Sequence, residues 1–393
     1  MRFQHPDGSV VHLAYCTNVH PAETLDGVLA QLRDYCEPVR RRLDRARLGI
    51  GLWLARDAAR TLVADAGARR TLREALERHG LEVVTLNGFP YRGFGGERVK
   101  YAVYTPDWTS RERLDHTADL AGLLAELLPG DEPEGTISTL PLAWRTPFTP
   151  QDQERALAHL TELAGRLDAL AERTGRSIRL ALEPEPGCIV ETTGQAAEVL
   201  TAPGAPPSSR VGVCLDTCHL ATAFEDPDRA IAGLTARGVP VVKAQLSAAL
   251  HAEHPGEPAV RAALADFAEP RFLHQTRERA PGGVLGHDDL DIALFGPEPL
   301  PGRDPWRVHL HIPLHARPHP PLTSTLPHLT QALTRLVGGE RALTRHLEVE
   351  TYTWQVLPPA LRPRTPEGLA DGIAAELSLA RDLLTGLGLK ELS

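Results

Sequence analysis

The sequence predicts an α/β protein that folds as a (β/α)8 TIM barrel with a long insertion between the seventh and eighth strands. Three observations support this fold class. Short apolar runs of strand length alternate with longer segments whose apolar residues recur at helical spacing. Eight strand runs of this kind occur, as a closed parallel barrel requires. An open doubly wound sheet is the alternative, but no GxGxxG motif follows the first run.

The expected strands and helices follow from this alternation. Two helix ends carry capping signals: Thr149 followed by Pro150 and Asp152 is typical of a helix start, and Gly80 of a helix end. Strands are expected at residues 11–16, 48–54, 81–86, 136–140, 178–183, 211–216, 241–246 and 346–352. Helices are expected at residues 24–43, 58–79, 110–128, 150–173 and 193–200.

The whole chain, residues 1–393, is expected to form a single barrel domain. Residues 201–209 are rich in Pro and Ser, which favours a surface loop. Residues 250–343 are far longer than one crossover needs, and they include a ninth strand-like piece at 306–313. Long insertions between barrel elements usually lie at the active-site end. We therefore expect this insertion to cover the C-terminal mouth of the barrel.

Charge and cysteine content exclude several classes of protein. With a formal net charge of −9, and with acidic residues around the basic run 40–42, the chain is a poor candidate for binding nucleic acid. Five cysteines without a CxxC pair do not make a disulfide framework. Residues 1–10 are polar, and no window of 18 uninterrupted apolar residues occurs. We expect a cytoplasmic protein without a signal peptide or transmembrane segment.

Acidic residues stand at the C-terminal ends of three expected strands, where barrels of this type place their functional groups. Glu183 ends the fifth strand, Asp216 ends the sixth, and Glu350 lies near the end of the eighth. Buried carboxylates around one mouth repel one another, and a divalent ion such as Mn, Zn, Mg or Co relieves that repulsion. We expect these residues to bind a metal ion. A helix cap or a salt bridge to a loop is the alternative.

Further candidates lie on strand seven and just after strand six. Lys243 and Gln245 share one face of strand seven, by the period of two. His219 lies three residues after Asp216 and can turn back over the same mouth, where it could ligate a metal, bind substrate or shuttle a proton. The alternative is a histidine in a first helical turn that is hydrogen-bonded to a loop.

A second histidine group lies in the insertion, where His309, His311 and His315 occur within seven residues. Alternation puts His309 and His311 on one face if this segment is extended. Imidazole is a common ligand of Zn or Mn, so we expect His311 to be a site residue, ahead of the other two. The histidines expected on the surface or in loops include His251, His254, His274 and His287.

Polar and aromatic residues at the strand ends are candidates for binding substrate hydroxyls. Residues 92–96 (RGFGG) lack the strand-to-helix form of a phosphate-binding loop. We expect a mobile aromatic flap there, with a simple irregular loop as the alternative. Cys16 and Cys218 are expected to be buried and inert. The substrate-binding candidates are Tyr15, Asn18, Asn87, Tyr91, His219 and Tyr352.

Residues 180–184 (LALEP) and 215–219 (LDTCH) resemble the strand-five and strand-six motifs of the xylose isomerase-like barrels. That superfamily includes sugar isomerases, sugar epimerases and endonuclease IV. More narrowly, residues 13–21 (LAYCTNVHP), 86–90 (LNGFP) and 347–354 (LEVETYTW) resemble EboE, a family of metabolite traffic proteins from the bacterial Ebo gene cluster. The resemblance implies a sugar- or polyol-like small molecule as ligand, and other Ebo-cluster proteins as partners.

The resemblance also implies a metal tetrad of Glu, Asp, His and Glu. Glu183, Asp216 and Glu350 match three of its places. The histidine of strand seven is absent, and Gln245 stands there. Its amide oxygen is a weaker ligand than imidazole. His311 from the insertion could supply the missing nitrogen instead.

Three functions follow as hypotheses. In a metal-dependent isomerase or epimerase, Glu183 and Glu350 would act as base and acid, and Lys243 or His219 would stabilise the oxyanion. A non-catalytic carrier of a metabolite is the alternative, favoured by the EboE resemblance and the missing histidine. A metal-dependent phosphoesterase of the endonuclease type is less favoured, because no histidines follow the second and third strands.

Overall fold

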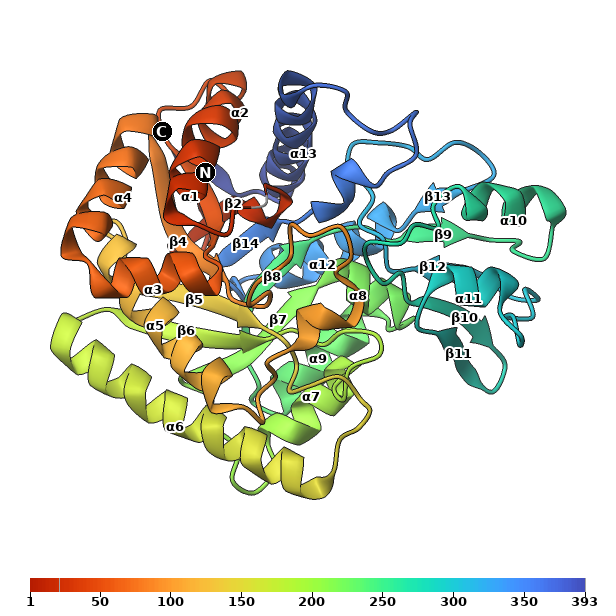
Figure 1. Ribbon diagram of the computed structural model, residues 1–393, viewed down its shortest axis with the longest axis horizontal. Coiled ribbons are helices and arrows are strands. Elements are labelled where there is room, and N and C mark those ends of the chain that lie inside the picture. Colours follow the sequence, from red (N-terminus) through yellow and green to blue (C-terminus); the bar gives the residue numbers. More distant parts are fainter. Residues whose placement is uncertain (21, 393) are drawn as a thin grey trace.

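The computed structural model describes residues 1–20 and 22–392, so Pro21 of the first EboE-like motif and Ser393 lie outside the described residues. Its centre is a closed barrel of eight parallel strands, which confirms the predicted fold class (Figure 1). Each strand pairs with the next, and β14 pairs with β2 to close the ring. The strands are β2 (Val10–Cys16), β3 (Leu48–Trp53), β4 (Leu81–Asn87), β5 (Glu134–Thr139), β6 (Ser177–Leu182), β7 (Val211–Asp216), β8 (Val241–Leu246) and β14 (His346–Val349).

The helices surround this barrel, and local signals explain several of their ends. Thr149 forms a capping box with Asp152, and Gly80 ends a helix at a φ of 66°, both as predicted. The helix predicted at 58–79 is broken at Asp65, whose side chain caps the second half. The helices are α1 (Leu25–Gln31), α2 (Glu37–Arg42), α3 (Arg56–Ala64), α4 (Ala66–His79), α5 (Arg111–Leu127), α6 (Pro150–Thr174), α7 (Thr193–Leu200), α8 (Thr217–Thr222), α9 (Pro227–Ala236), α12 (Leu326–Val337) and α13 (Pro366–Gly386).

Short elements at the two ends of the chain complete the barrel wall. β1 (Arg2–Gln4) pairs with β2 and β15 (Lys390–Leu392) pairs with β1, both antiparallel. None of the helices among the described residues is long and apolar enough to cross a bilayer. The five cysteines are buried free thiols.

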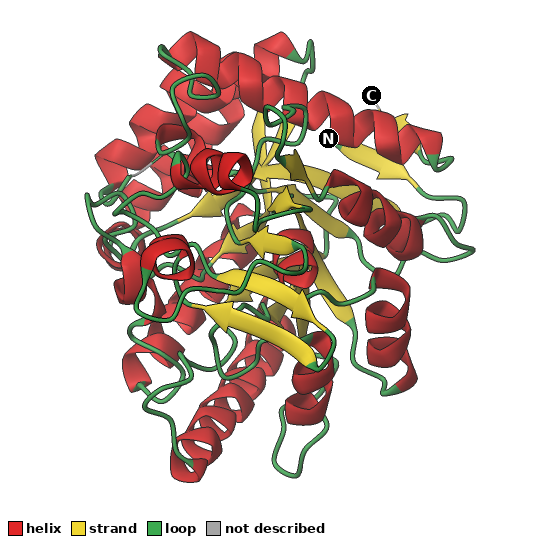
Figure 2. Ribbon diagram, turned by 90° about the vertical axis from the view of Figure 1, so that its right-hand side faces the viewer, coloured by secondary structure: helices red, strands yellow, loops and turns green. Residues whose placement is uncertain are grey.

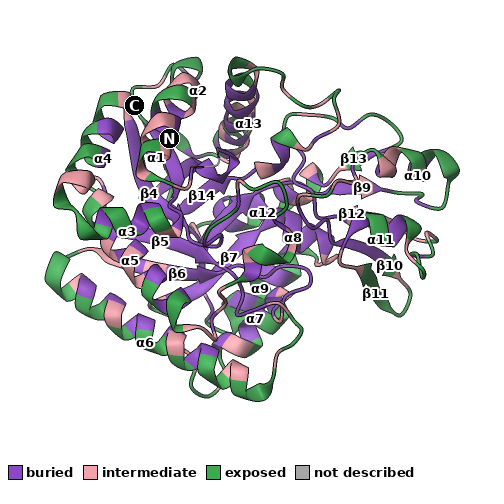
Figure 3. Ribbon diagram, in the orientation of Figure 1, coloured by how far each residue is buried: buried purple, intermediate pink, exposed green. Residues whose placement is uncertain are grey.

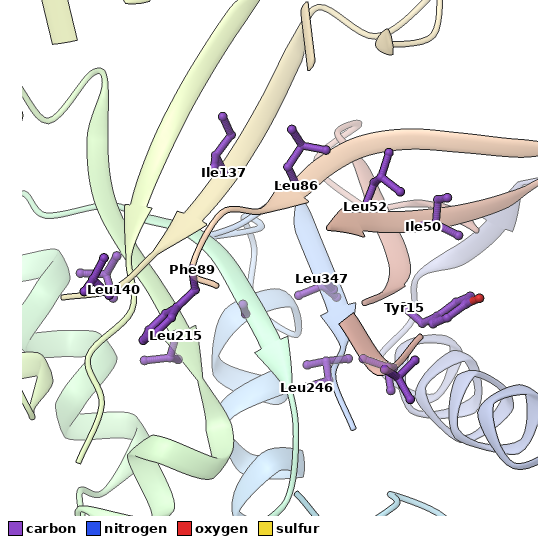
Figure 4. Packing of buried hydrophobic residues seen from close by; sticks show 14 of the residues in the cluster. Tyr15, Ile50, Leu52, Leu86, Phe89, Ile137, Leu140, Leu215, Leu246 and Leu347 are labelled. Carbon is purple, nitrogen blue, oxygen red and sulfur yellow. The ribbon is translucent and has the colours of Figure 1, made fainter. Parts of the chain in front are cut away.

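The barrel strands separate an apolar outer layer from a polar interior. Ile50, Leu52 and Leu347 are fully or nearly fully buried in the core shared with the helices, whose outer faces are exposed (Figures 3 and 4). Inside the barrel, Lys243 of β8 contacts the carboxylate of Glu348 of β14, and both side chains are fully buried. Glu348 therefore lies below the mouth rather than at it.

A second, antiparallel sheet follows β8 and lies beside the barrel, on the right in Figure 1 and toward the viewer in Figure 2. The ninth strand expected at 306–313 is shorter and ends at Val308. α12 follows the sheet and packs against α8 and α9. That all of this forms one domain stays a prediction. The sheet has β9 (Leu250–Ala252), β10 (Thr276–Ala280), β11 (Gly283–His287), β12 (Trp306–Val308) and β13 (Thr323–Ser324), with α10 (Pro258–Ala265) and α11 (Leu290–Phe295) nearby.

Glu376 of α13 ties the end of the insertion to the loop after β14. Its Oε1 accepts hydrogen bonds from the backbone N–H of Leu314 at 2.9 Å and from Oγ1 of Thr351 at 2.6 Å. These two partners lie close in sequence to His311 and Glu350. Burial raises the pKa of Glu376 to about 7.

We predict that Glu376→Gln flattens the pH dependence of stability. Unfolded glutamate releases its proton near pH 4.5 and folded Glu376 near 7, so the folded state binds more protons between these values and loses stability as pH rises. Glu376 is expected to contribute on the order of 2–3 kcal/mol to this loss in the wild-type protein. The variant keeps the same acceptor but lacks this contribution, whereas the contributions of Glu183 and Glu350, whose pKa values are also raised, remain in both proteins. Urea unfolding at pH 5 and pH 8 measures this. Equal pH dependence in both proteins would contradict it.

Candidate metal centre and ligand pocket

The strand ends bring three carboxylates together at the mouth of the barrel. Glu183 follows β6, Asp216 ends β7 and Glu350 follows β14. One oxygen of each lies within 4.8 Å of the others, and the three residues are at most 5% exposed. The eighth strand was predicted to reach Tyr352 but ends at Val349, so Glu350 stands on the loop, where its N–H donates to the carbonyl of Leu246 at 3.2 Å.

Mutual repulsion and burial disfavour the charged forms of these acids. Burial, followed by the charges of Glu350 and Asp216, raises the pKa of Glu183 well above its ordinary value. Burial and the charge of Asp216 likewise raise the pKa of Glu350. A cation among the three carboxylates would reverse both effects, because it favours the ionised forms.

Asp216 is oriented by three donors that all use the same oxygen. Its Oδ1 accepts from the N–H of Cys218 at 2.7 Å, the N–H of His219 at 2.9 Å and Oγ of Ser247 at 2.7 Å. It thereby caps α8. Its Oδ2 is buried without a hydrogen-bond partner among the described residues. The three hydrogen bonds to Oδ1 hold the carboxylate so that Oδ2 points toward the barrel mouth.

Glu350 is held by two amides that were expected to bind substrate. Nδ2 of Asn18 donates to Oε1 of Glu350 at 2.7 Å, and Nδ2 of Asn87 donates to the same oxygen at 2.9 Å. Oδ1 of Asn87 in turn accepts from the N–H of Phe89 at 3.0 Å. Both asparagines line the pocket, and each donates one N–H to Glu350. Oδ1 of Asn18 is buried without a hydrogen-bond partner among the described residues. The position of the two asparagines makes them positioning residues for this carboxylate.

His311 reaches the same centre from the insertion. Its Nδ1–H donates to the backbone carbonyl of Glu350 at 2.6 Å, which leaves a lone pair on Nε2. That Nε2 lies 3.8 Å from Oδ2 of Asp216 and has no hydrogen-bond partner among the described residues. Burial lowers the pKa of His311 to about 4, so the ring is neutral. Two buried lone pairs that face one another suit a shared cation.

Gln245, the other candidate for a fourth ligand, is also buried beside Asp216. Its β8 position pairs in register with Asp216 of β7 and with Glu348 of β14. Neither atom of its amide group has a hydrogen-bond partner among the described residues. The orphaned atoms of Glu183, Asp216 and His311, with this free amide, form a donor set that fits a divalent ion of the Mn or Zn type.

A second histidine pair lies beside this centre. Nδ1–H of His219 donates to the carbonyl of Pro184 at 2.9 Å, as the alternative for this residue anticipated, yet its Nε2 faces Nε2 of His309 at 3.1 Å. Nδ1 of His309 meets Oε1 of Gln275 at 2.7 Å. Burial, followed by the neighbouring histidines, lowers the pKa of His309 well below its ordinary value.

Glu185 fixes the tautomer of His309 through Gln275, as the carbonyl of Pro184 fixes that of His219. Its Oε1 accepts from the hydroxyl of Tyr104 at 2.7 Å and from Nε2 of Gln275 at 3.4 Å. The amide oxygen of Gln275 must therefore face His309, whose Nδ1 carries the proton. Both facing Nε2 atoms are then acceptors, a contact that needs a cation or a proton between them. Glu185, His219 and His309 offer ligand atoms within 4.8 Å of one another.

Four predicted residues lie away from the pocket. Lys243 pairs with Glu348 inside the barrel, and its Nζ donates to Oγ of Ser138 at 3.3 Å. It therefore does not reach the mouth, where a residue that stabilises an oxyanion would have to lie. Tyr15 points outward, with its hydroxyl 3.4 Å from Nε2 of His20. The other two corrections are Tyr91, which packs on His116 and Arg113, and His315, which is exposed against Trp354.

Tyr352 and the glycine-rich loop do reach the pocket. Tyr352 begins a short 3-10 helix, and its hydroxyl lies 3.4 Å from Nε2 of His309. Phe94 of the loop 92–96 is buried and lines the pocket. The pocket wall also contains Glu183, His219, His311 and Glu350, whereas Asp216 lies behind it.

Sequence reasoning missed Glu185 and Tyr104 and ranked His309 too low. The Glu183-Pro184-Glu185 spacing was a signal, since the second acid shares a face with the first in an extended loop. His274, expected on the surface or in a loop, lies in a loop but is fully buried, and its ring bridges the carbonyl of His309 at 3.0 Å and Oε1 of Glu269 at 2.8 Å. This bridging role depends on how the insertion folds, so the sequence alone does not show it.

Solved structures resemble the chain at low sequence identity. An IOLI protein with a bound zinc atom is 15% identical with a TM-score of 0.48, covering 96% of this chain and 99% of that one. D-allulose 3-epimerase from Methylomonas sp. is 12% identical with a TM-score of 0.48, covering 95% and 96%. A D-tagatose 3-epimerase-like protein is 11% identical with a TM-score of 0.49, covering 96% and 98%. No curated protein matches the sequence.

The sequence itself matches one family model, over residues 49–262. That span is more than half of the 393 residues and contains Glu183, Asp216 and His219. It runs from the second barrel strand into the insertion. The family is described as the xylose isomerase-like TIM barrel, and this chain belongs to it.

Proposed function

We propose that the protein is a metal-dependent isomerase or epimerase that acts on a small hydroxylated carbonyl compound of the sugar or polyol type. The observation that carries this proposal is the convergence of Glu183, Asp216 and Glu350, buried at one mouth with His311 aimed at Asp216. Membership of the xylose isomerase-like family supports it.

The chemistry divides among these residues by their position. A divalent ion held by Glu183, Asp216, Glu350 and His311 would polarise a carbonyl and its neighbouring hydroxyl, which acidifies the C–H between them. Glu183 and Glu350 line the pocket and are the candidates for removing and returning that proton. Asp216 lies behind the wall and serves as a ligand alone.

Neighbouring residues prepare the two glutamates for proton transfer. Asn18 and Asn87 fix Oε1 of Glu350, so the remaining oxygen keeps one direction. The buried charge of Lys243 favours the ionised forms of Glu183 and Glu350 without contact to substrate. His219 presents its Nε2 at the pocket wall, where it can accept a substrate hydroxyl.

We predict that wild-type protein binds a divalent ion and that Asp216→Asn and His311→Ala each weaken binding on the order of 100-fold. Gln245→Ala is expected to leave affinity within a few-fold, because imidazole is the stronger ligand. The exposed neighbour His315→Ala is the matched control. Titration calorimetry with Mn and Zn, combined with elemental analysis, measures this. The larger loss in the Gln245 variant would assign the fourth ligand to the amide.

We also predict exchange of substrate hydrogen with solvent. Aldoses, ketoses and keto-polyols incubated in D₂O with metal-loaded protein should gain deuterium at the carbon beside the carbonyl, as NMR detects. Glu183→Gln and Glu350→Gln should each lower that rate by about 10²- to 10⁴-fold, since each removes a proton-transfer group. His315→Ala should not. Exchange that persists in both glutamine variants would sink the mechanism.

A non-catalytic metabolite traffic protein of the EboE type, with other Ebo-cluster proteins as partners, is the alternative. Gln245 at the strand-seven position supports it, since a weaker ligand there suits holding a metabolite better than activating one. Tight, metal-dependent binding of a polyol without any hydrogen exchange would favour this function.

Hydrolysis of a phosphate ester is a second candidate, favoured by the facing Nε2 atoms of His219 and His309. A second ion there, with Glu185, would lie beside the first, as two-ion phosphoesterases require. If this candidate holds, wild-type protein binds two equivalents of metal and His309→Ala lowers them to one. Hydrolysis of bis(p-nitrophenyl) phosphate that disappears with the second equivalent would support this candidate. A single equivalent in wild type would exclude it.

A further inference from the structure

The pocket above the candidate metal centre has two chemically different halves. The inner half presents the carboxylates and imidazoles already described. The outer half presents hydrocarbon, and its wall consists of Phe94, Val99, Val103, Phe272 and Leu273. The ring of Tyr352 stands between the halves, with its hydroxyl toward His309.

Two segments far apart in the sequence build the wall of the outer half. Phe94 and Val99 come from the long loop after β4, and Phe272 comes from the insertion. The centroids of the Phe94 and Phe272 rings are 5.3 Å apart, and those of Phe272 and Tyr352 are 5.0 Å apart. With Trp53, these side chains form an apolar cluster distinct from the main core. The aromatic part of the wall is therefore a cluster of its own at the mouth, whereas Leu273 joins the wall to the main core.

The polar groups near this wall are already engaged. Nζ of Lys100 contacts the carboxylate of Asp289 and lies 3.3 Å from the carbonyl of Glu269. The N–H groups of Val99 and Lys100 donate to the carbonyl of Arg271 at 2.8 and 2.9 Å. Apart from the third N–H of Lys100, a ligand hydroxyl placed against Val99, Val103 or Leu273 would therefore lose water without gaining a donor or an acceptor.

We propose that the ligand of this pocket is an amphiphile, with a small hydroxylated head at the metal centre and an alkyl or aryl substituent in the outer half. This inference rests on the proposed function for the head alone. An unsubstituted sugar carries hydroxyls on every side, and part of them would lie against Val99, Val103 and Leu273. Aromatic rings can stack on a sugar face, but these aliphatic side chains offer only burial of hydrocarbon.

The test compares matched ligands that differ only in the apolar part. Metal-loaded protein is titrated calorimetrically with D-fructose and D-glucitol, and with their 1-O-alkyl ethers from methyl to pentyl. Affinity should rise about three- to fourfold for each methylene that enters the outer half. Equal affinity for the free sugars and the ethers, or failure of every ether to bind, would overturn the proposal.

Variants locate the effect in the outer half. Val103→Asn and Leu273→Asn should flatten the dependence on chain length. They should not weaken the binding of the free sugars, because each new amide offers a donor and an acceptor to a sugar hydroxyl. Val284→Asn is the matched control, because Val284 is 46% exposed on β11 and its replacement should leave the dependence intact. If the increase of affinity with chain length is unchanged in correctly folded Val103 and Leu273 variants, the proposal is also overturned. The titration of wild-type protein tests the proposal even if these variants do not fold.

The outcome is separable from that of the proposed function. Hydrogen exchange on unsubstituted sugars, with affinity independent of chain length, would leave the isomerase standing and refute the amphiphile. If affinity rises with chain length but the protein binds no metal or catalyses no exchange, the amphiphilic ligand is supported and the isomerase function is refuted. The same titrations on EDTA-treated protein distinguish these cases.

Discussion

The barrel buries the carboxylates of Glu183, Asp216, Glu348 and Glu350 in its interior and at its mouth, and one lysine side chain balances their charge only in part. Glu348 is paired with Lys243 below the mouth. Glu183, Asp216 and Glu350 are left to face one another, with no cationic side chain in hydrogen-bond contact among the described residues. Burying such charges without compensation costs several kcal/mol per ion, so the arrangement implies protons or a cation at the mouth.

The barrel accommodates this charge through small residues rather than through solvent. A Cβ at Gly51 would lie 1.4 Å from Oε1 of Glu348, so the strand must carry glycine there. Lys243 then transmits a positive field to the mouth without reaching it, which is the physical reason that it affects Glu183 and Glu350 at a distance. The charge of Lys243 in the barrel interior thus influences the protonation of the acids at the mouth.

The sequence was sufficient for the features that depend on local periodicity. The barrel strands and the placement of Glu183 and Asp216 at their ends follow from apolar runs that stop at an acid. Tyr15 was misplaced, although the period of two puts it on the opposite face from its neighbour Cys16. The hydrogen bond from Asn87 to Glu350 could not be predicted, because the two residues are 263 positions apart in the chain. Contacts of that kind arise from tertiary folding alone.

The insertion has a consequence for how such proteins can diversify. A single contiguous stretch between β8 and α12 supplies both His311, aimed at the metal centre, and Phe272, part of the outer wall. Replacement of that stretch would change the ion preference and the range of accepted molecules in one event, while the barrel strands keep their sequence. In this architecture one loop insertion can then be inherited as a unit that sets specificity, separately from the acids that follow the barrel strands.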